Sequence, residues 1–126
     1  MSVEIKGDKE LIAYLEHADE RILPDGKRVV SKGALNIKND WRRRWRGIAH
    51  APRLPLSISY DLHEDEVSVW ADIGPVDGPQ LQGFLGPIIE YGGIHNAPQP
   101  GGLLSLQVEQ PKYEAAIDAL VAKLYP

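Results

Sequence analysis

The chain has 126 residues, 43% of them hydrophobic and 25% charged, which suits one compact domain spanning residues 1–126. It contains no cysteine, which excludes disulfides and thiolate metal sites. It also contains no run of roughly 18 apolar residues and no secretory signal pattern, which predicts a soluble protein made in the cytoplasm, without membrane contact. The net charge of −4 conceals a basic segment, since residues 24–53 carry nine basic and two acidic side chains; such a segment on an acidic body suits docking onto further copies or contact with a polyanion.

Two helices are predicted in the first half of the chain. Apolar residues recur at spacings of three and four through residues 8–22, which predicts an amphipathic helix. After a turn, a second apolar stripe predicts a longer helix over residues 27–46, which Gly47 ends. The stripe includes two tryptophans that we expect to anchor this helix in the core, Trp41 and Trp45.

The second half of the chain reads as a hairpin, a loop and a helix. Residues 56–62 and 67–73 alternate apolar and polar side chains, which predicts an antiparallel pair of strands. Residues 74–102 contain eight glycines and five prolines and predict a long shaped loop, which is uncommon in a compact domain unless it binds something. Pro111 suits the first turn of a final helix, and residues 103–109 fit either loop or helix. The predicted fold class is therefore α+β: a small antiparallel sheet packed with N-terminal helices and a C-terminal helix, with a long Gly/Pro-rich loop.

Enzymatic signatures are missing from the sequence. It contains no G-x-S-x-G element, no P-loop and no dinucleotide-binding motif. His63 stands in a predicted polar turn without a second histidine at ligand spacing, and His95 lies in the Gly/Pro-rich loop. Glu90 is expected to be a buried or interfacial carboxylate, paired with an arginine or with backbone amides. We expect no enzymatic activity, cofactor or metal site; a hydrolase or metalloprotein built around these three residues is a further alternative.

The run from Trp41 to Trp45 places three consecutive arginines between the two tryptophans. These arginines can form a solvated or salt-bridged surface, a subunit interface, or non-specific contacts to phosphates. The sequence does not separate these possibilities. The alternative function is therefore a non-specific nucleic-acid-binding module that uses the basic helix 27–46, with these side chains: Lys38, Arg42, Arg43 and Arg46.

A motif in the Gly/Pro-rich loop indicates a family. Ile89-Glu90-Tyr91-Gly92-Gly93, followed by Asn96-Ala97-Pro98-Gln99-Pro100, is similar to a Glu-aromatic-Gly-Thr element and a downstream Pro-x-Pro in the small head–tail joining proteins of long-tailed bacteriophages. These are also called neck, connector or tail-completion proteins. The resemblance covers about residues 29–124, including a helix, a proline-containing connector and a strand over residues 34–62. The chain departs from the family pattern at Gly93, where the family has threonine, and at residues 53–55, where many members have Thr-Gly.

The resemblance implies a structural virion protein at the head–tail junction. It would be made in the host cytoplasm and would form a closed ring of about six copies, which requires two different patches on each subunit. The ring would join the head-completion (stopper) protein to the tail terminator or tail tube protein, and genomic DNA would pass through it without sequence-specific contacts. The subunit-interface candidates are Arg42, Arg43, Arg46, Glu90, Tyr91, Gly92, Gly93, Asn96, Pro98 and Pro100.

Overall fold

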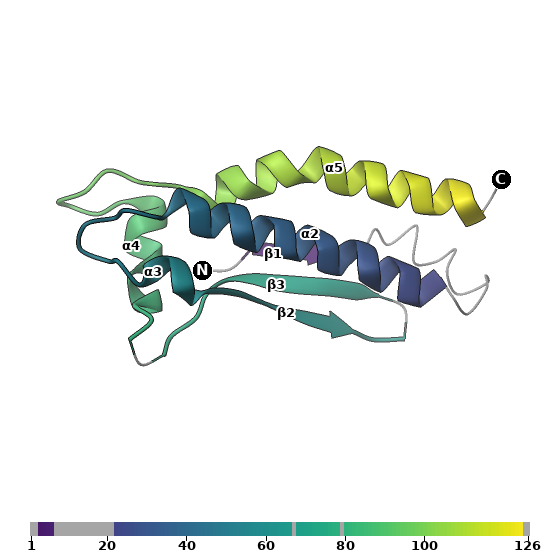
Figure 1. Cartoon of the computed structure of the whole chain (residues 1–126), viewed down its shortest axis with the longest axis horizontal. Coiled ribbons are helices and arrows are strands. Elements are labelled where there is room, and N and C mark those ends of the chain that lie inside the picture. The colour runs from purple at the N-terminus through teal and green to yellow at the C-terminus, as the bar shows by residue number, and fades with distance from the viewer. Residues whose placement is uncertain (1–2, 7–21, 67, 79, 125–126) are drawn as a thin grey trace.

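The computed structural model describes residues 3–6, 22–66, 68–78 and 80–124, and its architecture is α+β, as predicted (Figure 1). The helix predicted over residues 8–22 lies outside the described residues except at its last position. No helix in the described ranges is long and apolar enough to cross a membrane. The helices are α2 (Ile22–Arg44), α3 (Leu54–Ser57), the 3-10 helix η1 (Gly83–Leu85), α4 (Gly86–Tyr91) and α5 (Gly101–Leu124); the strands are β1 (Val3–Lys6), β2 (Ile58–Glu64) and β3 (Val69–Pro75).

The sheet is antiparallel and has the strand order β1-β3-β2. The predicted hairpin forms, but both of its strands begin and end two residues later than predicted, with Tyr60 opposite Ile73 and Glu64 opposite Val69. Alternation within β3 places Val69, Ala71 and Ile73 in the core. Strand β1 was not predicted, because four alternating residues are too short a pattern to identify a strand.

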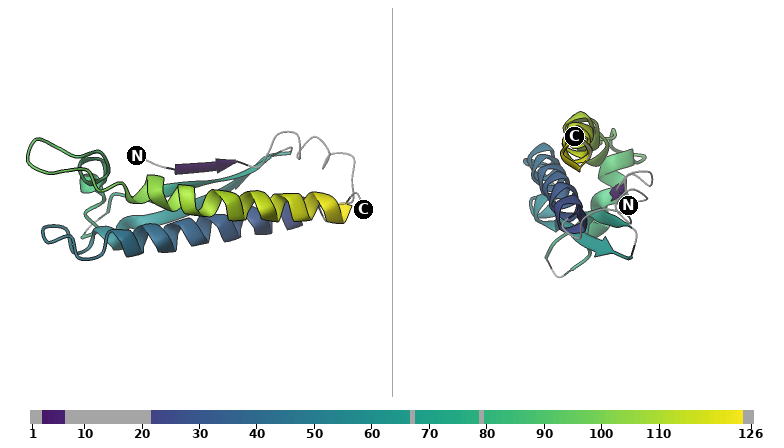
Figure 2. Two further views of the ribbon diagram at one scale, coloured as in Figure 1. Left: turned by 90° about the horizontal axis from the view of Figure 1, so that it is seen from above. Right: turned by 90° about the vertical axis from the view of Figure 1, so that its right-hand side faces the viewer.

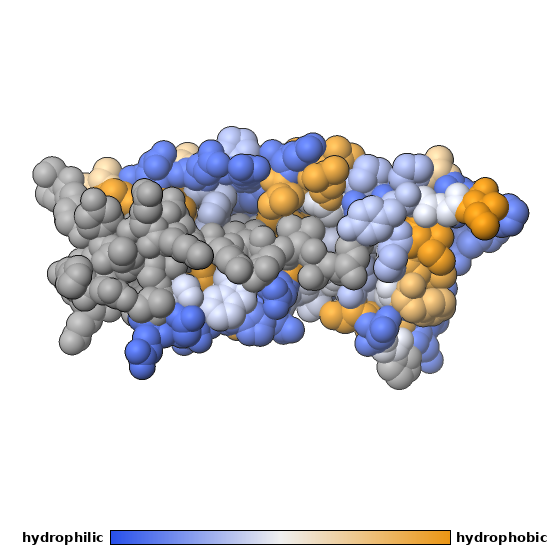
Figure 3. Space-filling model, turned by 180° about the vertical axis from the view of Figure 1, so that it is seen from behind, coloured by the Kyte–Doolittle hydropathy of each residue, from blue (hydrophilic) through white to orange (hydrophobic). Residues whose placement is uncertain are grey.

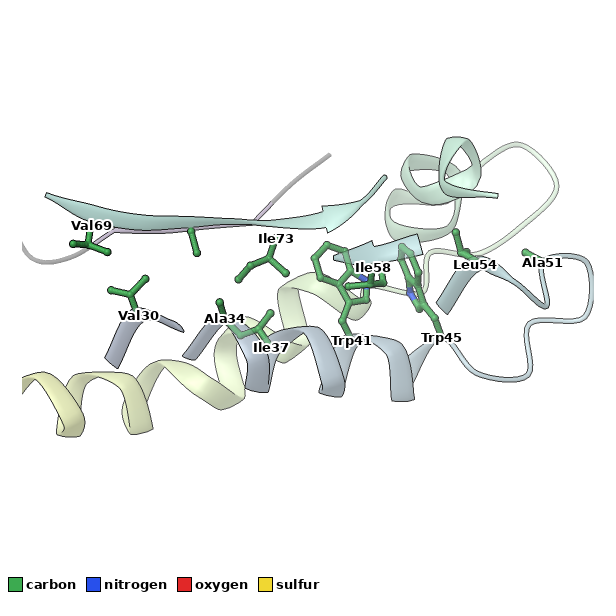
Figure 4. Close-up of a cluster of buried hydrophobic side chains, with 11 residues drawn as sticks. Val30, Ala34, Ile37, Trp41, Trp45, Ala51, Leu54, Ile58, Val69 and Ile73 are labelled. Carbon is green, nitrogen blue, oxygen red and sulfur yellow. The ribbon is translucent and has the colours of Figure 1, made fainter. Parts of the chain in front are cut away.

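Helix α2 packs on one face of the sheet, and α5 packs along α2 (Figures 1 and 2). The buried stripe of α2 faces β3 and ends at the two tryptophans, whose rings meet edge to face with 5.4 Å between their centroids (Figure 4). Such pairs stabilise a core beyond the area that they bury. The buried core cluster is Val30, Ala34, Ile37, Trp41, Trp45, Ala51, Leu54, Ile58, Val69, Ala71 and Ile73.

Helix α2 begins five residues earlier than predicted, and it includes residues 24–26, which the sequence indicated as a turn. Pro24 is tolerated there because the amide groups of a first helical turn have no partner within the helix. Asp25 follows in the first turn, where a carboxylate interacts favourably with the helix dipole. The helix also ends two residues earlier than predicted, at Arg44, and the turn that follows it reaches Gly47, which has a φ of +83°.

The predicted loop over residues 74–102 was wrong in part, because it contains η1, α4 and the first residues of α5. Pro87 stands at the start of α4, where proline is favoured. The predicted start of the last helix at Pro111 was also wrong, because α5 begins at Gly101 and Pro111 lies within it. Pro111 removes the bond to the carbonyl of Gln107, but Gln107 is exposed, so water can satisfy that carbonyl.

Candidate protein–protein interface

The loop between α4 and α5, residues 92–100, is closed by backbone hydrogen bonds at its base. The Gly92 amide donates to the Ile88 carbonyl over 2.9 Å, and the Gln99 amide donates to the Ile89 carbonyl over 2.7 Å. Gly92 has a φ of +84°, which only glycine adopts readily. A side chain at this position would also lie 3.0 Å from the Pro98 ring. The glycine and the proline of the motif therefore shape the base of the loop.

Asn96 holds the turn above this base. The Gly93 amide donates to the Asn96 carbonyl over 3.0 Å, and Nδ2 of Asn96 donates to the Ile88 carbonyl over 3.1 Å. The turn lies against α4, since a Cβ on Gly93 would stand 3.4 Å from Cγ2 of Ile88. Two exposed residues lie between Gly93 and Asn96: Ile94, whose exposed fraction is 97%, and His95.

Glu90 is buried and accepts hydrogen bonds from the start of α5. Its Oε1 is 2.8 Å from the Gly102 amide, and its Oε2 is 3.4 Å from the Leu103 amide. Of the partners expected for this carboxylate, the structure shows the backbone amides. A carboxylate at a helix N-terminus satisfies amides that lack intrahelical partners and interacts favourably with the helix dipole. Glu90 therefore acts within its own chain, joining α4 to α5.

Replacing Glu90 with glutamine is expected to lower the free energy of unfolding by about 1–2 kcal/mol, because the neutral amide loses the charge and sets an NH2 group against backbone donors. Denaturant unfolding measures this change. Asp118→Asn, at an exposed position of the same helix, is the matched control and should change stability by less than about 0.5 kcal/mol. Equal effects of the two substitutions would show that the Glu90 contact is not stabilising.

The two sequence motifs meet at the start of α5. Nε1 of Trp45 donates to the Gln99 carbonyl over 2.9 Å, so α2 holds the last part of the loop directly. Gly101 and Gly102 lie on the tryptophan rings: a Cβ on Gly101 would be 2.6 Å from Nε1 of Trp45, and one on Gly102 would be 2.6 Å from the Trp41 ring. Both tryptophans thus lie in the core and also support the loop, a link that the sequence analysis missed.

The arginines of α2 are largely committed to partners within the chain. Nε and Nη2 of Arg42 donate to the Ile58 carbonyl over 3.0 and 2.7 Å. Arg43 and Arg44 both bind the carboxylate of Asp40. Burial alone would raise the pKa of Asp40, but the hydrogen bonds from Arg44 and Arg43 outweigh it and hold that pKa below its ordinary value.

Two other basic residues of the predicted binding set, Lys38 and Arg46, differ in their surroundings. Nζ of Lys38 lies 5.4 Å from the centre of the Tyr60 ring, within the range of a cation–π contact. Arg46 is exposed just beyond the end of α2. Of the arginines expected at an interface, Arg42 and Arg43 therefore have partners within the chain, whereas Arg46 is exposed and forms no ion pair among the described residues.

An apolar surface covers the end of the molecule at α4. We call this surface the apolar end; its members are Phe84, Ile88, Tyr91 and Ile94, with exposed fractions of 70%, 47%, 70% and 97%. The first three follow one another at spacings of four and three residues, so they share one face of η1 and α4. In Figure 3 hydrophobic residues gather at this end of the molecule. Of the predicted interface residues only Tyr91 belongs to it. The helical spacing from residue 84 to 91 was the available signal for Phe84 and Ile88, but glycine and proline obscured it.

The catalytic and metal alternatives gain no support from the geometry. No group of three or more His, Asp or Glu side chains in the described part of the chain is placed to hold a metal ion. His63 stacks on Trp70 with 5.5 Å between ring centroids, and its Nε2 lies 3.1 Å from Asp72 on the sheet. His95 is exposed, and Glu90 is bound to α5. These three candidate groups therefore have separate surroundings.

Comparisons of the chain with protein-family models, with curated proteins and with solved structures each found no match. The function is therefore inferred from the geometry of the described residues and from the motif resemblance.

Proposed function

We propose that this chain is a structural subunit of the ring that joins head and tail in a long-tailed bacteriophage. The observation that carries the proposal is the loop over residues 92–100, which we call the braced loop because backbone hydrogen bonds close its base. It presents Ile94 almost fully exposed beside the other residues of the apolar end. Contiguous exposed apolar surface marks sites of protein association, because its burial is worth about 25 cal/mol per Å². Since hydrogen bonds already fix the loop, little conformational entropy is lost when a partner binds it.

The proposed partners are further copies in a closed ring of about six, with the stopper protein on the head side and the tail terminator or tail tube protein on the other. Genomic DNA would pass through the ring without sequence-specific contacts. The motif that resembles the joining family is the same segment that forms the braced loop. Its glycines, prolines, Glu90 and Asn96 shape and hold the loop, and its neighbour Ile94 is presented for contact.

The alternative of non-specific nucleic-acid binding has weaker support. Phosphate contacts by Arg42 would compete with its two bonds to the Ile58 carbonyl, and contacts by Arg43 would compete with Asp40. Lys38 lies over the Tyr60 ring. Affinity for a polyanion rises with the number of available cations, and only Arg46 of this set lacks such a competing contact among the described residues.

Electron microscopy of the phage particles whose genome encodes the chain tests the proposed location. We expect density that fits this fold in a ring between the head and the tail. A location in the head shell, in a tail fibre or outside the particle would overturn the proposal.

Replacing Ile94 with aspartate is expected to prevent the joining of heads to tails while leaving the fold intact. The side chain is 97% exposed, so stability should change by less than about 0.5 kcal/mol, whereas a charge at the centre of an apolar contact opposes association. The measurement is complementation of a phage lacking the gene, with particles counted by electron microscopy. Ile94→Val, which keeps the apolar surface, should support joining, and normal particles from the aspartate variant would contradict the assignment of this loop.

A further inference from the structure

We propose that Ile94 of one copy binds a pocket at the start of α5 in the next copy. The inference rests on the proposed ring and names the surface that receives the apolar end. It makes the contact heterologous: a protruding tip on one subunit meets a hollow on its neighbour. Contacts of this kind generate closed rings when the rotation between subunits closes.

The receiving pocket lies where the loop joins α5. Its volume is about 200 Å³, and it is lined by Arg44, Trp45, Gln99, Pro100, Gly101 and Leu104. Leu104 of this lining is 38% exposed, and two further apolar side chains of α5, Leu103 and Val108, have exposed fractions of 51% and 46%. In Figure 3 hydrophobic surface over α5 is separated by paler residues from the hydrophobic end at α4. The chain therefore offers two distinct apolar surfaces.

Both surfaces carry little charge. Residues 91–100, which form the tip, contain no Lys, Arg, Asp or Glu. The charged residue that lines the pocket, Arg44, already forms an ion pair with Asp40 over 2.8 Å. Residues 101–110 contain one charged side chain, Glu109, and it is buried and accepts a hydrogen bond from Asn36 over 3.0 Å. Association of these surfaces would therefore remove few charges from water, and so it would avoid the largest penalty in forming an interface.

The tip and the pocket cannot meet within one chain. The loop extends beyond the end of the body, whereas the pocket lies on the body at the root of the same loop (Figures 1 and 2). Contact between two tips is also disfavoured. Arg46 is exposed at the same end of the molecule, and exposed Arg53 lies beside η1 through its bonds to Gln80 and Gln82, so tip-to-tip pairing would bring like charges together.

Disulfide trapping tests the contact, because the chain has no cysteine of its own. The full chain is prepared as Ile94→Cys and as Leu104→Cys, and the two are mixed at high concentration under mild oxidation. Disulfides require the two Cα atoms to come within about 7 Å. We expect the mixture to give a heterodimer, and the chain carrying both substitutions to give a ladder of cross-linked oligomers.

The matched control is Ala115→Cys, an exposed position on α5 that lies about 16 Å further along the helix. We expect about tenfold less heterodimer from Ile94→Cys with this control than with Leu104→Cys. Equal yields from the two mixtures, or cross-linking confined to pairs of Ile94→Cys chains, would overturn the proposed contact. If trapping fails but electron microscopy places the chain at the head–tail junction, only the proposed contact is wrong. If trapping succeeds but the chain is located elsewhere, only the proposed function is wrong.

Discussion

Replacing Trp41 with alanine is expected to lower the free energy of unfolding by about 3–5 kcal/mol. The side chain is 0% exposed, and it packs against Trp45 on one side and the backbone of Gly101 and Gly102 on another. Since small domains are stabilised by only about 5–15 kcal/mol in total, this single change removes a large share of the stability. Denaturant unfolding at equilibrium measures the loss.

Trp70→Ala is the matched control for this substitution. Trp70 is half-buried, and it lies on the sheet face that points away from α2, where it stacks on His63. Its loss leaves no enclosed cavity, so the cost should be about 1–2 kcal/mol. If Trp41→Ala destabilised the protein no more than Trp70→Ala does, then Trp41 would not be the central support of the core.

The parts of the fold that the sequence predicted are those in which local pattern and tertiary packing agree. The stripe that ends at Trp41 and Trp45 identifies the body of α2, and alternation identifies β2 and β3 to within two residues. The strand ends lay two residues from their predicted positions, because the alternating pattern fixes which side chains face inward but does not fix where a strand ends. Pro75, for example, extends β3 although proline is disfavoured in strands, and it does so at the end of the strand.

The helices that were missed are those whose glycines and prolines serve tertiary contacts. Gly101 and Gly102 begin α5 because only glycine allows its backbone to lie on the two tryptophan rings, yet as a local signal they indicate a loop. Pro111 lies inside α5 at an exposed position, although it suggested a helix start. Propensity describes the isolated segment, and here packing between distant segments outweighs it.

The sequence drew attention to the segment of the candidate interface but not to the role of each residue. The motif around Glu90 and Tyr91 lies in the segment that forms the loop between α4 and α5, and an amide-bound carboxylate was among the expectations for Glu90. Ile94 was not singled out, because its exposure depends on the hydrogen bonds that close the loop, such as the one from Gln99 to Ile89. That bond joins residues ten apart, and no local pattern encodes it.

Replacing Gly102 with alanine is expected to destabilise the protein by about 1–3 kcal/mol, although the same change in an exposed helix stabilises by up to about 1 kcal/mol. The new Cβ would lie 2.6 Å from Cη2 and 2.7 Å from Cζ2 of Trp41, closer than carbon atoms pack. The backbone cannot retreat freely, because the Gly102 amide is bound to Glu90 over 2.8 Å. Relief of the clash therefore disturbs either the core or the helix cap.

Gly33→Ala is the control that isolates this contact, because Gly33 is a buried glycine within α2 whose new Cβ would meet only the ring edge of Tyr113, at 3.2 Å. A half-buried ring can shift by a few tenths of an ångström, so its stability should change by less than about 1 kcal/mol in either direction. Denaturant unfolding of both variants gives the comparison. If Gly102→Ala were neutral or stabilising, the start of α5 would not be pressed onto Trp41, and the rigid link from the core to the displayed loop would be lost with it.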